Sequence, residues 1–230
     1  MASLEEVQAH ESKLYYELSH FYDRVFTRVF SPRIEQVIRS LSIEPGARVI
    51  EVGAGTGLSF AAYPAHCQVT GIDLAPEMLE KAQEKIDRNG WRHLKVIEMD
   101  ALDLKFQDNS FDYAMAFHVV SVVPDAARLM REVLRVTRPG GTVVIINHFR
   151  SRNRLLATLD RLVEPIWRRL GWHTLSLDEV VGGMPLTIER AYKLSSRSLF
   201  TIVIAKNRKS EQPNRQQTTD GERTPKRAVG

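Results

Sequence analysis

The chain has 230 residues and is 43% hydrophobic, so it is long enough and apolar enough to bury the core of one domain with short extensions. Its formal charge is +4 at pH 7, but part of this excess lies in the C-terminal tail, so the charge does not by itself indicate nucleic acid as a partner. The single cysteine, Cys67, excludes an internal disulfide and a metal site built from cysteines, which fits a reducing cytoplasm.

Residues 3–30 are predicted to form an amphipathic helix or helix pair. Ser3 and Glu6 have the spacing of a capping box, and apolar residues return at helical spacing along the segment. Its acidic start is unlike a secretion signal, and nowhere in the chain do about eighteen apolar residues run together as in a membrane span. Tyr15 and Tyr22 either pack half-buried on the domain or belong to a lid over a ligand pocket.

A strand that stops in a glycine-rich turn follows. Val49, Ile50 and Val52 form a short apolar run within 47–52, typical of a strand buried on both faces. Residues 53–57 read Gly-Ala-Gly-Thr-Gly, which permits a sharp turn and a close approach to a ligand. The turn is neither the GxGxxG of a dehydrogenase nor a phosphate loop ending in Lys-Ser/Thr. Glu51 beside it suits a cationic ligand, and Asp73 at the end of the next strand can accept hydrogen bonds from two ribose hydroxyls.

Strands and helices alternate through the domain after a short helix at 34–41. The predicted strands are 47–52, 68–73, 94–98, 111–117 and 142–147, and helices are predicted from Gly57, at 76–89 and at 125–135. This alternation indicates parallel strands with helices on both faces of the sheet. Ligands of such sheets lie at the carboxyl ends of the strands, so we expect the glycine turn, Asp73, Asp100 and His118 to share one crevice.

Basic and apolar residues are segregated on a helix predicted at 153–170. Arg154, Arg161 and Arg168 recur at heptad spacing and therefore share one face, while Leu and Trp residues supply an opposing apolar side and Pro165 introduces a kink. This pattern is typical of a helix lying in a membrane interface, and equally of an ordinary surface helix with a solvated arginine face.

The C-terminal part of the chain contains a predicted hairpin and a polar tail. Two strands, at 186–194 and 198–205, are close enough in sequence to form an antiparallel hairpin at the sheet edge. After Lys206 the composition loses almost all apolar residues, so residues 207–230 are predicted to be disordered. The basic excess of this tail adds weak attraction to anionic lipid.

Together these features resemble the class I S-adenosylmethionine-dependent methyltransferases. The matching stretches are VIEVGAGTG at 49–57, VTGIDLAPEML at 69–79, MDAL at 99–102 and LRVTRPGG at 134–141. The resemblance implies a Rossmann-like α/β fold with a seven-stranded, mostly parallel sheet, one antiparallel edge hairpin and an N-terminal helical lid. It implies this division of the chain: N-terminal amphipathic helices and lid at 1–42, methyltransferase domain at 43–206, and tail at 207–230.

The same resemblance implies S-adenosylmethionine as cofactor and S-adenosylhomocysteine as product. Asp73 then holds the ribose, Asp100 meets the adenine edge, and Tyr22, in a Tyr-Asp pair typical of the family, reaches the methionine end. Asp73 also caps the helix that follows it, and both roles can hold. The implied cofactor residues are Tyr22, Glu51, Gly53, Ala54, Gly55, Thr56, Gly57, Asp73, Leu74, Met78, Asp100, Ala101, Leu102, Phe117 and His118.

Further stretches are similar to the soluble bacterial phospholipid N-methyltransferases, which convert phosphatidylethanolamine stepwise to phosphatidylcholine. They are SVVPDA at 121–126, RVTRPGG at 135–141, NHF at 147–149 and LGW at 170–172. His118 departs from that family, in which an aromatic residue such as tyrosine is expected. The resemblance implies a cytoplasmic, monomeric protein without metal or nucleic acid, held peripherally on the anionic cytoplasmic membrane by its N-terminal helix and the Arg-rich helix.

Methylation of a lipid amine requires a group that takes a proton from the ammonium and a partner for the phosphate. The candidate catalytic residues are Tyr22, Tyr15, His118 and His148, and the candidate headgroup residues are Tyr15, His148 and Arg150. His148 can also be read as a strand-end histidine whose ring bonds only the backbone.

Other functions remain open at this point. A methyltransferase of a small soluble acceptor or a quinone precursor shares the same cofactor core, and a non-catalytic membrane-binding protein of the same fold is disfavoured by the intact acidic and glycine positions. A nucleic-acid methyltransferase is disfavoured because Phe117-His118-Val119-Val120 stands where an NPPY-like tetrapeptide would follow the fourth strand, and because no RNA-binding module is added.

Overall fold

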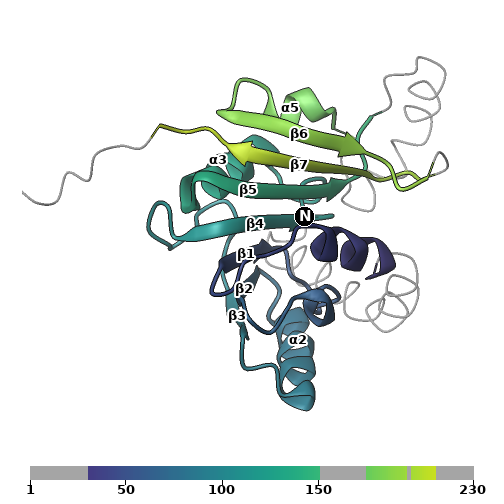
Figure 1. The fold of residues 1–230 in the computed structure, drawn as a ribbon, viewed down its shortest axis with the longest axis vertical. Coiled ribbons are helices and arrows are strands. Elements are labelled where there is room, and N and C mark those ends of the chain that lie inside the picture. Colours follow the sequence, from purple (N-terminus) through teal and green to yellow (C-terminus); the bar gives the residue numbers. More distant parts are fainter. Residues whose placement is uncertain (1–30, 151–174, 196–197, 211–230) are drawn as a thin grey trace, which may run out of the picture.

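A computed structural model describes residues 31–150, 175–195 and 198–210, and these residues contain one mixed sheet (Figure 1). Its strands are β1 (Arg48–Val52), β2 (Gln68–Asp73), β3 (Leu94–Glu98), β4 (Phe111–Phe117), β5 (Thr137–Asn147), β6 (Leu186–Tyr192) and β7 (Thr201–Asn207). The order in this part of the chain is β3-β2-β1-β4-β5-β7-β6, which Figure 1 shows from bottom to top. Strands β1 to β5 pair in parallel, whereas β7 is antiparallel to both β5 and β6. The predicted seven-stranded sheet with an antiparallel edge hairpin is therefore confirmed.

Helices cover both faces of the sheet. They comprise a helix at residues 31–40, α2 (Pro76–Asn89), α3 (Ala126–Val136) and α5 (Leu177–Val181), with a single 3-10 turn, η1 (Phe60–Ala62). The predicted bounds of α2 are confirmed: Pro76 occupies its first turn, and Gly90 ends it with a φ of 64°. Asp125 caps α3 by accepting a hydrogen bond from the Arg128 backbone N at 2.8 Å.

The prediction of a helix starting at Gly57 is wrong, because only the short 3-10 turn η1 forms there. Gly57 has a φ of 71°, which a right-handed helix does not use. Tyr63 is extended, with a φ of −73° and a ψ of 132°, as expected for a residue that precedes a proline, here Pro64. The segment between these two points is too short for a longer helix.

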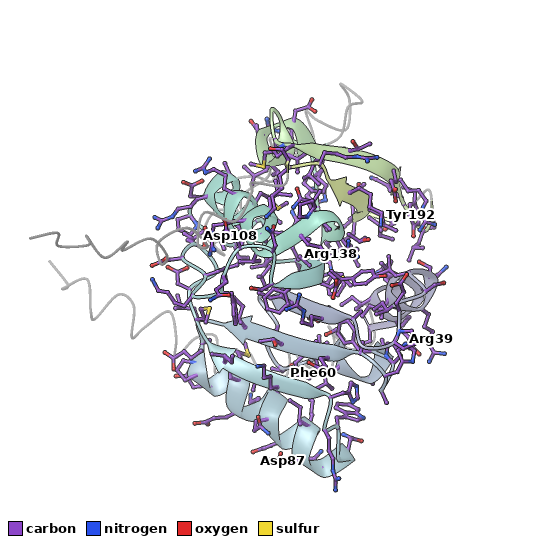
Figure 2. The ribbon with its side chains drawn as sticks, turned by 60° about the vertical axis from the view of Figure 1, so that its left-hand side comes forward. Arg39, Phe60, Asp87, Asp108, Arg138 and Tyr192 are labelled. Atoms are coloured by element: carbon purple, nitrogen blue, oxygen red, sulfur yellow. The ribbon has the colours of Figure 1, made fainter. Side chains whose placement is uncertain are left out.

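Two apolar clusters lie on opposite faces of the sheet, and side chains of each strand alternate between them. Val49 and Ile146 pack with the helix at 31–40 and with α2, whereas Ile50 and Ile145 pack with α3 and α5. Phe60, labelled in Figure 2, is 1% exposed in the first cluster. With both faces covered, the carboxyl ends of the parallel strands are the edge available to a ligand.

Asn207, predicted to lie in the tail, instead ends β7. Its amide is fully buried and donates to the carbonyl oxygens of Leu134 at 2.9 Å and Thr137 at 2.8 Å. Strand β5 also begins earlier than predicted, at Thr137, because a register shift against β4 lets the chain pair directly after α3. None of the helices in the described ranges combines the length and the apolarity needed to cross a bilayer.

Candidate active site

The glycine turn after β1 has glycines with two different surroundings. Gly53 has a φ of 70°, and a Cβ there would lie 2.6 Å from Cγ2 of Val119, in the loop after β4. Gly55 has a φ of 53°, and a Cβ there would meet nothing within 4 Å. Gly53 is therefore required by the packing of the protein itself, while the space beside Gly55, on the side where a Cβ would stand, is open.

Neighbouring elements hold the rest of the turn. The backbone N of Ala54 donates to the carbonyl of Ile72 in β2 at 2.9 Å. The Lys85 ammonium, from α2, donates to the Thr56 carbonyl oxygen at 2.7 Å and lies 3.3 Å from its hydroxyl. The turn is thus fixed to β2 on one side and to α2 on the other, which organises its backbone before any ligand binds.

Asp73, at the end of β2, joins the glycine turn to the start of α2. Its Oδ2 accepts a hydrogen bond from the Gly55 backbone N at 2.8 Å, and its Oδ1 accepts one from the Ala75 backbone N at 3.0 Å. A carboxylate offers about four lone-pair sites, so two further donors such as ribose hydroxyls can be accommodated. Leu74 beside it is 66% exposed, which leaves an apolar surface next to these acceptors.

The residues after β3 lie beside this position. The Met99 backbone N donates to the Asp73 carbonyl at 3.0 Å, so the ends of β2 and β3 are joined. Asp100 is exposed, and its Oδ1 accepts a hydrogen bond from the Leu102 backbone N at 2.8 Å, which closes a turn. Ala101 and Leu102 are half-buried against the core, and Met78 at the start of α2 is half-buried.

Glu51 lies beneath the glycine turn and is 2% exposed. Its carboxyl oxygens accept hydrogen bonds from the Ser59 hydroxyl at 2.7 Å and the Tyr63 hydroxyl at 2.5 Å. Burial raises the pKa of Glu51 to about 7, an effect that the two hydroxyl donors oppose and the charge of Asp73 reinforces. Burial and the neighbouring Glu51 carboxyl also raise the pKa of Tyr63.

Ser59 and Tyr63 are site-supporting residues that the sequence analysis missed, since both lie in the segment read as a helix. Their contacts make Glu51 a bridge between β1 and the segment that carries η1. We propose that Glu51 supports the cofactor turn from below rather than facing the ligand.

His118 follows β4 in a left-handed backbone conformation that is uncommon for residues other than glycine. Its φ is 60°, and its backbone N donates to the Ile146 carbonyl at 2.7 Å. Burial, and to a smaller extent the charge of Arg33, lowers the pKa of His118 to about 4, so the imidazole is neutral at pH 7. The preceding residue, Phe117, is buried in the core.

His148 follows β5 and is tied to the hairpin. Its Nδ1 lies 2.9 Å from the carbonyl oxygen of Leu199, which can only accept, so Nδ1 is the donor. In the neutral ring Nε2 then carries the lone pair and is the atom able to take a proton. The backbone contact expected for a strand-end histidine and a proton-accepting nitrogen are therefore both present.

An aromatic ring joins the two histidines. Phe200 contacts the His118 ring with a centroid separation of 4.7 Å and the His148 ring with one of 6.4 Å, both edge to face. The guanidinium carbon of Arg33 lies 6.0 Å from the Phe200 centroid. Neither Phe200 nor Arg33 was predicted, because no local motif marks them. The pairing of β5 with β7 brings Phe200 to the histidines, and the packing of the helix at 31–40 brings Arg33 there.

Some predicted site residues lie elsewhere or outside the described residues. Arg150 is half-buried, and its Nη1 lies 4.0 Å from Oε1 of Glu179 in α5. Tyr15 and Tyr22, in the expected lid, fall outside the described residues, as does the Arg-rich segment at 153–170. The described part of the site therefore consists of the cofactor edge and the ring cluster around Phe200.

Comparison with known proteins agrees with this layout. The model of a methyltransferase domain family matches residues 50–145. A phosphatidylethanolamine N-methyltransferase of Cereibacter sphaeroides is 40% identical over 160 residues, which cover 69% of this chain and 79% of that protein. A demethylmenaquinone methyltransferase of Geobacillus kaustophilus is 33% identical over 144 residues, covering 58% of this chain, which spans only 61% of that relative's length.

Solved structures share the fold at low sequence identity. The YcgJ protein of Bacillus subtilis superimposes with a TM-score of 0.65 and 17% identity, covering 77% of this chain and 98% of that one. A geranyl diphosphate methyltransferase in complex with S-adenosylmethionine gives a TM-score of 0.64 and 15% identity, covering 78% and 86%. These likenesses extend the match from the family segment to the sheet as a whole.

Proposed function

The chain belongs to the class I S-adenosylmethionine-dependent methyltransferase family, with S-adenosylmethionine as its cofactor, and from that membership we propose that it is a phospholipid N-methyltransferase. Its acceptor in this proposal is the amine of phosphatidylethanolamine and of the mono- and dimethylated forms that lead to phosphatidylcholine. The observation that carries the proposal is the 40% identity to a phosphatidylethanolamine N-methyltransferase, over 79% of that relative's length.

The residues at the strand ends fit the cofactor. In the proposal Asp73 binds the ribose hydroxyls through its remaining lone pairs, and Leu74 and Ala101 flank the adenine. The open space at Gly55 receives the methionine part. When bound, S-adenosylmethionine supplies a methyl group attached to a positively charged sulfur. The remaining cofactor assignments, to Tyr22, Met78 and the other implied residues except Glu51, which supports the turn, stand as part of the same proposal.

The protein must also prepare the lipid amine, which is an ammonium at neutral pH. An alkylammonium resembles Lys, whose pKa is about 10.4, so removing its proton at pH 7 requires roughly 4–5 kcal/mol. His148 Nε2 is the acceptor that we propose, because the Leu199 carbonyl holds the proton on the other ring nitrogen. His118 is a poor base at pH 7, since burial lowers its pKa to about 4. Tyr15 and Tyr22 complete the proposed set from the N-terminal lid.

The proposal includes peripheral binding to the cytoplasmic membrane surface by a monomer. The N-terminal helix and the Arg-rich segment at 153–170 are the proposed contacts with anionic lipid, and Arg150 with His148 is proposed to contact the headgroup. Flotation with liposomes tests this directly. The protein should float with vesicles containing anionic lipid, and floating less at high salt would identify an electrostatic contribution.

A second acceptor class is favoured by one observation, the 33% identity to a demethylmenaquinone methyltransferase. One experiment separates the two. Purified protein is incubated with methyl-labelled S-adenosylmethionine and either phosphatidylethanolamine liposomes or a reduced demethylated quinone, and the products are separated. Label in mono-, di- or trimethylated lipid supports the proposal. Label in the quinone alone would replace it, and label in neither, with cofactor binding intact, would favour a non-catalytic protein.

A further inference from the structure

We infer that Phe200 and Arg33 form the subsite for the lipid headgroup beside His148. In this arrangement the Phe200 ring receives the amine and its methylated forms, and the Arg33 guanidinium pairs with the phosphate. The inference rests on the proposed function, because it assigns the parts of that substrate to named side chains in the same site.

The Phe200 ring is held in place by the hairpin that carries it. The register of β5 and β7 pairs Asn147 with Thr201, so Phe200 arrives next to His148 at the carboxyl end of β5. Ser198 is 6% exposed, and its hydroxyl contacts the Phe200 backbone N at 3.3 Å and the Phe200 carbonyl oxygen at 3.1 Å. These contacts fix the backbone of Phe200, which limits where its ring can lie before a ligand binds.

The ring lies at the carboxyl ends of the strands, where we place the reacting amine. It contacts histidines that end two adjacent parallel strands, β4 and β5, and the glycine turn ends β1, which pairs with β4. Phe200 is half-buried, so part of its surface is accessible to a ligand. A cation within about 6 Å of an aromatic centroid is attracted by the electron-rich face of the ring.

Successive methylation explains why a ring suits this substrate. Each transfer replaces an N–H of the acceptor by N–CH3, so the hydrogen-bond donors of the amine disappear one by one. A carbonyl or carboxylate partner loses its hydrogen bond along this series, whereas the attraction between the ring face and the positive charge remains. A protein that carries one lipid through several transfers therefore benefits from an aromatic contact at the amine.

Arg33 supplies the charge that the phosphate needs. Its guanidinium carbon is 6.0 Å from the Phe200 centroid. Its positive charge also acts on His118: burial is the larger cause of the lowered pKa of that residue, and the charge of Arg33 is the smaller one. A guanidinium can give two parallel hydrogen bonds to one phosphate. Two carbons and one ester oxygen separate phosphorus from nitrogen in the headgroup, so an arginine beside a ring matches the neighbouring charges of a zwitterion.

The test compares variants across acceptors that differ only in methylation. Wild type, Phe200→Met, Phe200→Tyr and Arg33→Gln are assayed in mixed micelles with phosphatidylethanolamine and its mono- and dimethyl forms, and cofactor affinity is measured for each. Phe200→Met keeps the apolar volume without the ring, and Phe200→Tyr keeps the ring. Arg39→Gln is the matched control, because Arg39, labelled in Figure 2, is on the same helix and exposed to solvent. Its guanidinium is paired with Glu35.

Phe200→Met should raise KM for the dimethyl lipid about fivefold and affect the unmethylated lipid less, because the unmethylated ammonium keeps hydrogen-bond donors that the dimethyl form has lost. Phe200→Tyr should keep the wild-type ranking of KM values for the three lipids, because it keeps the ring. Arg33→Gln should raise KM for all three lipids alike, by about tenfold, because the phosphate is common to them. Cofactor affinity and the Arg39→Gln variant should match wild type.

The possible failures are distinguishable. Equal effects of Phe200→Met on all three lipids, or normal KM values in Arg33→Gln, would overturn the subsite while wild-type lipid methylation upholds the proposed function. Absence of lipid methylation by the wild type, with cofactor binding intact, would overturn both. Loss of cofactor binding in Phe200→Met would mean that Phe200 is needed for the packing of the site. In that case Phe200→Tyr provides the test, and a changed ranking of its KM values for the three lipids would overturn the headgroup subsite.

Discussion

Asp73 Oδ2 lies 2.8 Å from the backbone N of Gly55, so the carboxylate that ends β2 is hydrogen-bonded to the middle of the turn that ends β1. This bond places the proposed ribose acceptor against the cradle for the methionine part. The two ends of one elongated cofactor are therefore coupled through a single side chain. Substitution of either Asp73 or Gly55 should therefore lower the affinity for the cofactor.

Replacing Asp73 by Ala should weaken cofactor binding by about a hundredfold or more, since each hydrogen bond to a charged acceptor is worth about 1.5–3 kcal/mol. Isothermal titration with S-adenosylmethionine measures this. Asp87→Ala is the control, because Asp87 lies exposed near the far end of α2, where its Oδ1 accepts a hydrogen bond from Gln83 at 2.8 Å. Unchanged affinity in Asp73→Ala would remove this residue from the ribose role and leave it as the link between the glycine turn and the backbone N of Ala75.

Gly53 and Gly55 should respond differently to the same substitution. Gly53→Ala combines a positive φ with a Cβ placed 2.6 Å from Val119, so it should lower the free energy of unfolding by about 2–4 kcal/mol. Gly55→Ala meets no atom within 4 Å and should lose only about 1–2 kcal/mol, but should reduce cofactor affinity by filling the cradle. Urea unfolding and titration of both variants check this, and equal destabilisation would contradict it.

The buried Glu51 should make stability depend on pH. Its carboxyl has a pKa of about 7 in the folded protein, above the ordinary 4.5 expected when unfolded. Between these values the folded state binds more protons, so stability should fall as pH rises from 4.5 to 7, by about 3 kcal/mol in total, and stay level above 7. Glu51→Gln keeps the shape of the protonated form, so it should lack this part of the slope.

Urea unfolding of both proteins at several pH values between 5 and 8 measures the difference. Because every other titrating group is shared, the difference between the two curves isolates Glu51. The same slope in wild type and Glu51→Gln would mean that the carboxyl does not titrate in this range. Ser59→Ala offers a further comparison, since it removes one donor to the carboxyl and should raise the pKa of Glu51 further.

The parts of the molecule that depend on neighbours in sequence could be predicted. Strand bounds such as 68–73 follow from short apolar runs, the end of α2 follows from Gly90, and the place of Asp73 follows from the strand it ends. The helix expected from Gly57 was wrong because periodicity alone ignored the positive φ of that glycine and the effect of Pro64 on the residue before it.

The residues that support the glycine turn and those proposed to bind the lipid headgroup could not be predicted from neighbours in sequence. Tyr63 reaches Glu51 only because η1 folds the segment back under the turn. Phe200 reaches His148 only because β7 enters the sheet beside β5 rather than at the edge, with β6 outside it. Both contacts depend on the order of strands and on packing between distant segments, which no motif spacing encodes.

The last prediction concerns His148 and distinguishes a proton acceptor from a strand-end histidine that bonds only the backbone. His148→Asn keeps a side-chain N–H that can donate to the Leu199 carbonyl, as Nδ1 does, but has no counterpart of Nε2. If Nε2 takes the proton from the lipid amine, kcat should fall about a hundredfold while cofactor affinity is unchanged. Added imidazole should restore part of the rate, because it replaces the missing base.

His148→Gln is the matched variant, since its amide nitrogen extends toward the Nε2 position and is a poor substitute for the Leu199 contact. A base at Nε2 predicts low kcat in both variants, with rescue by imidazole. An anchor for the hairpin predicts instead that His148→Asn is normal and that His148→Gln is destabilised, because the hairpin then loses its contact at the Leu199 carbonyl. Initial rates and thermal unfolding of the two proteins decide between a proton acceptor and a strand-end histidine bonded to the backbone.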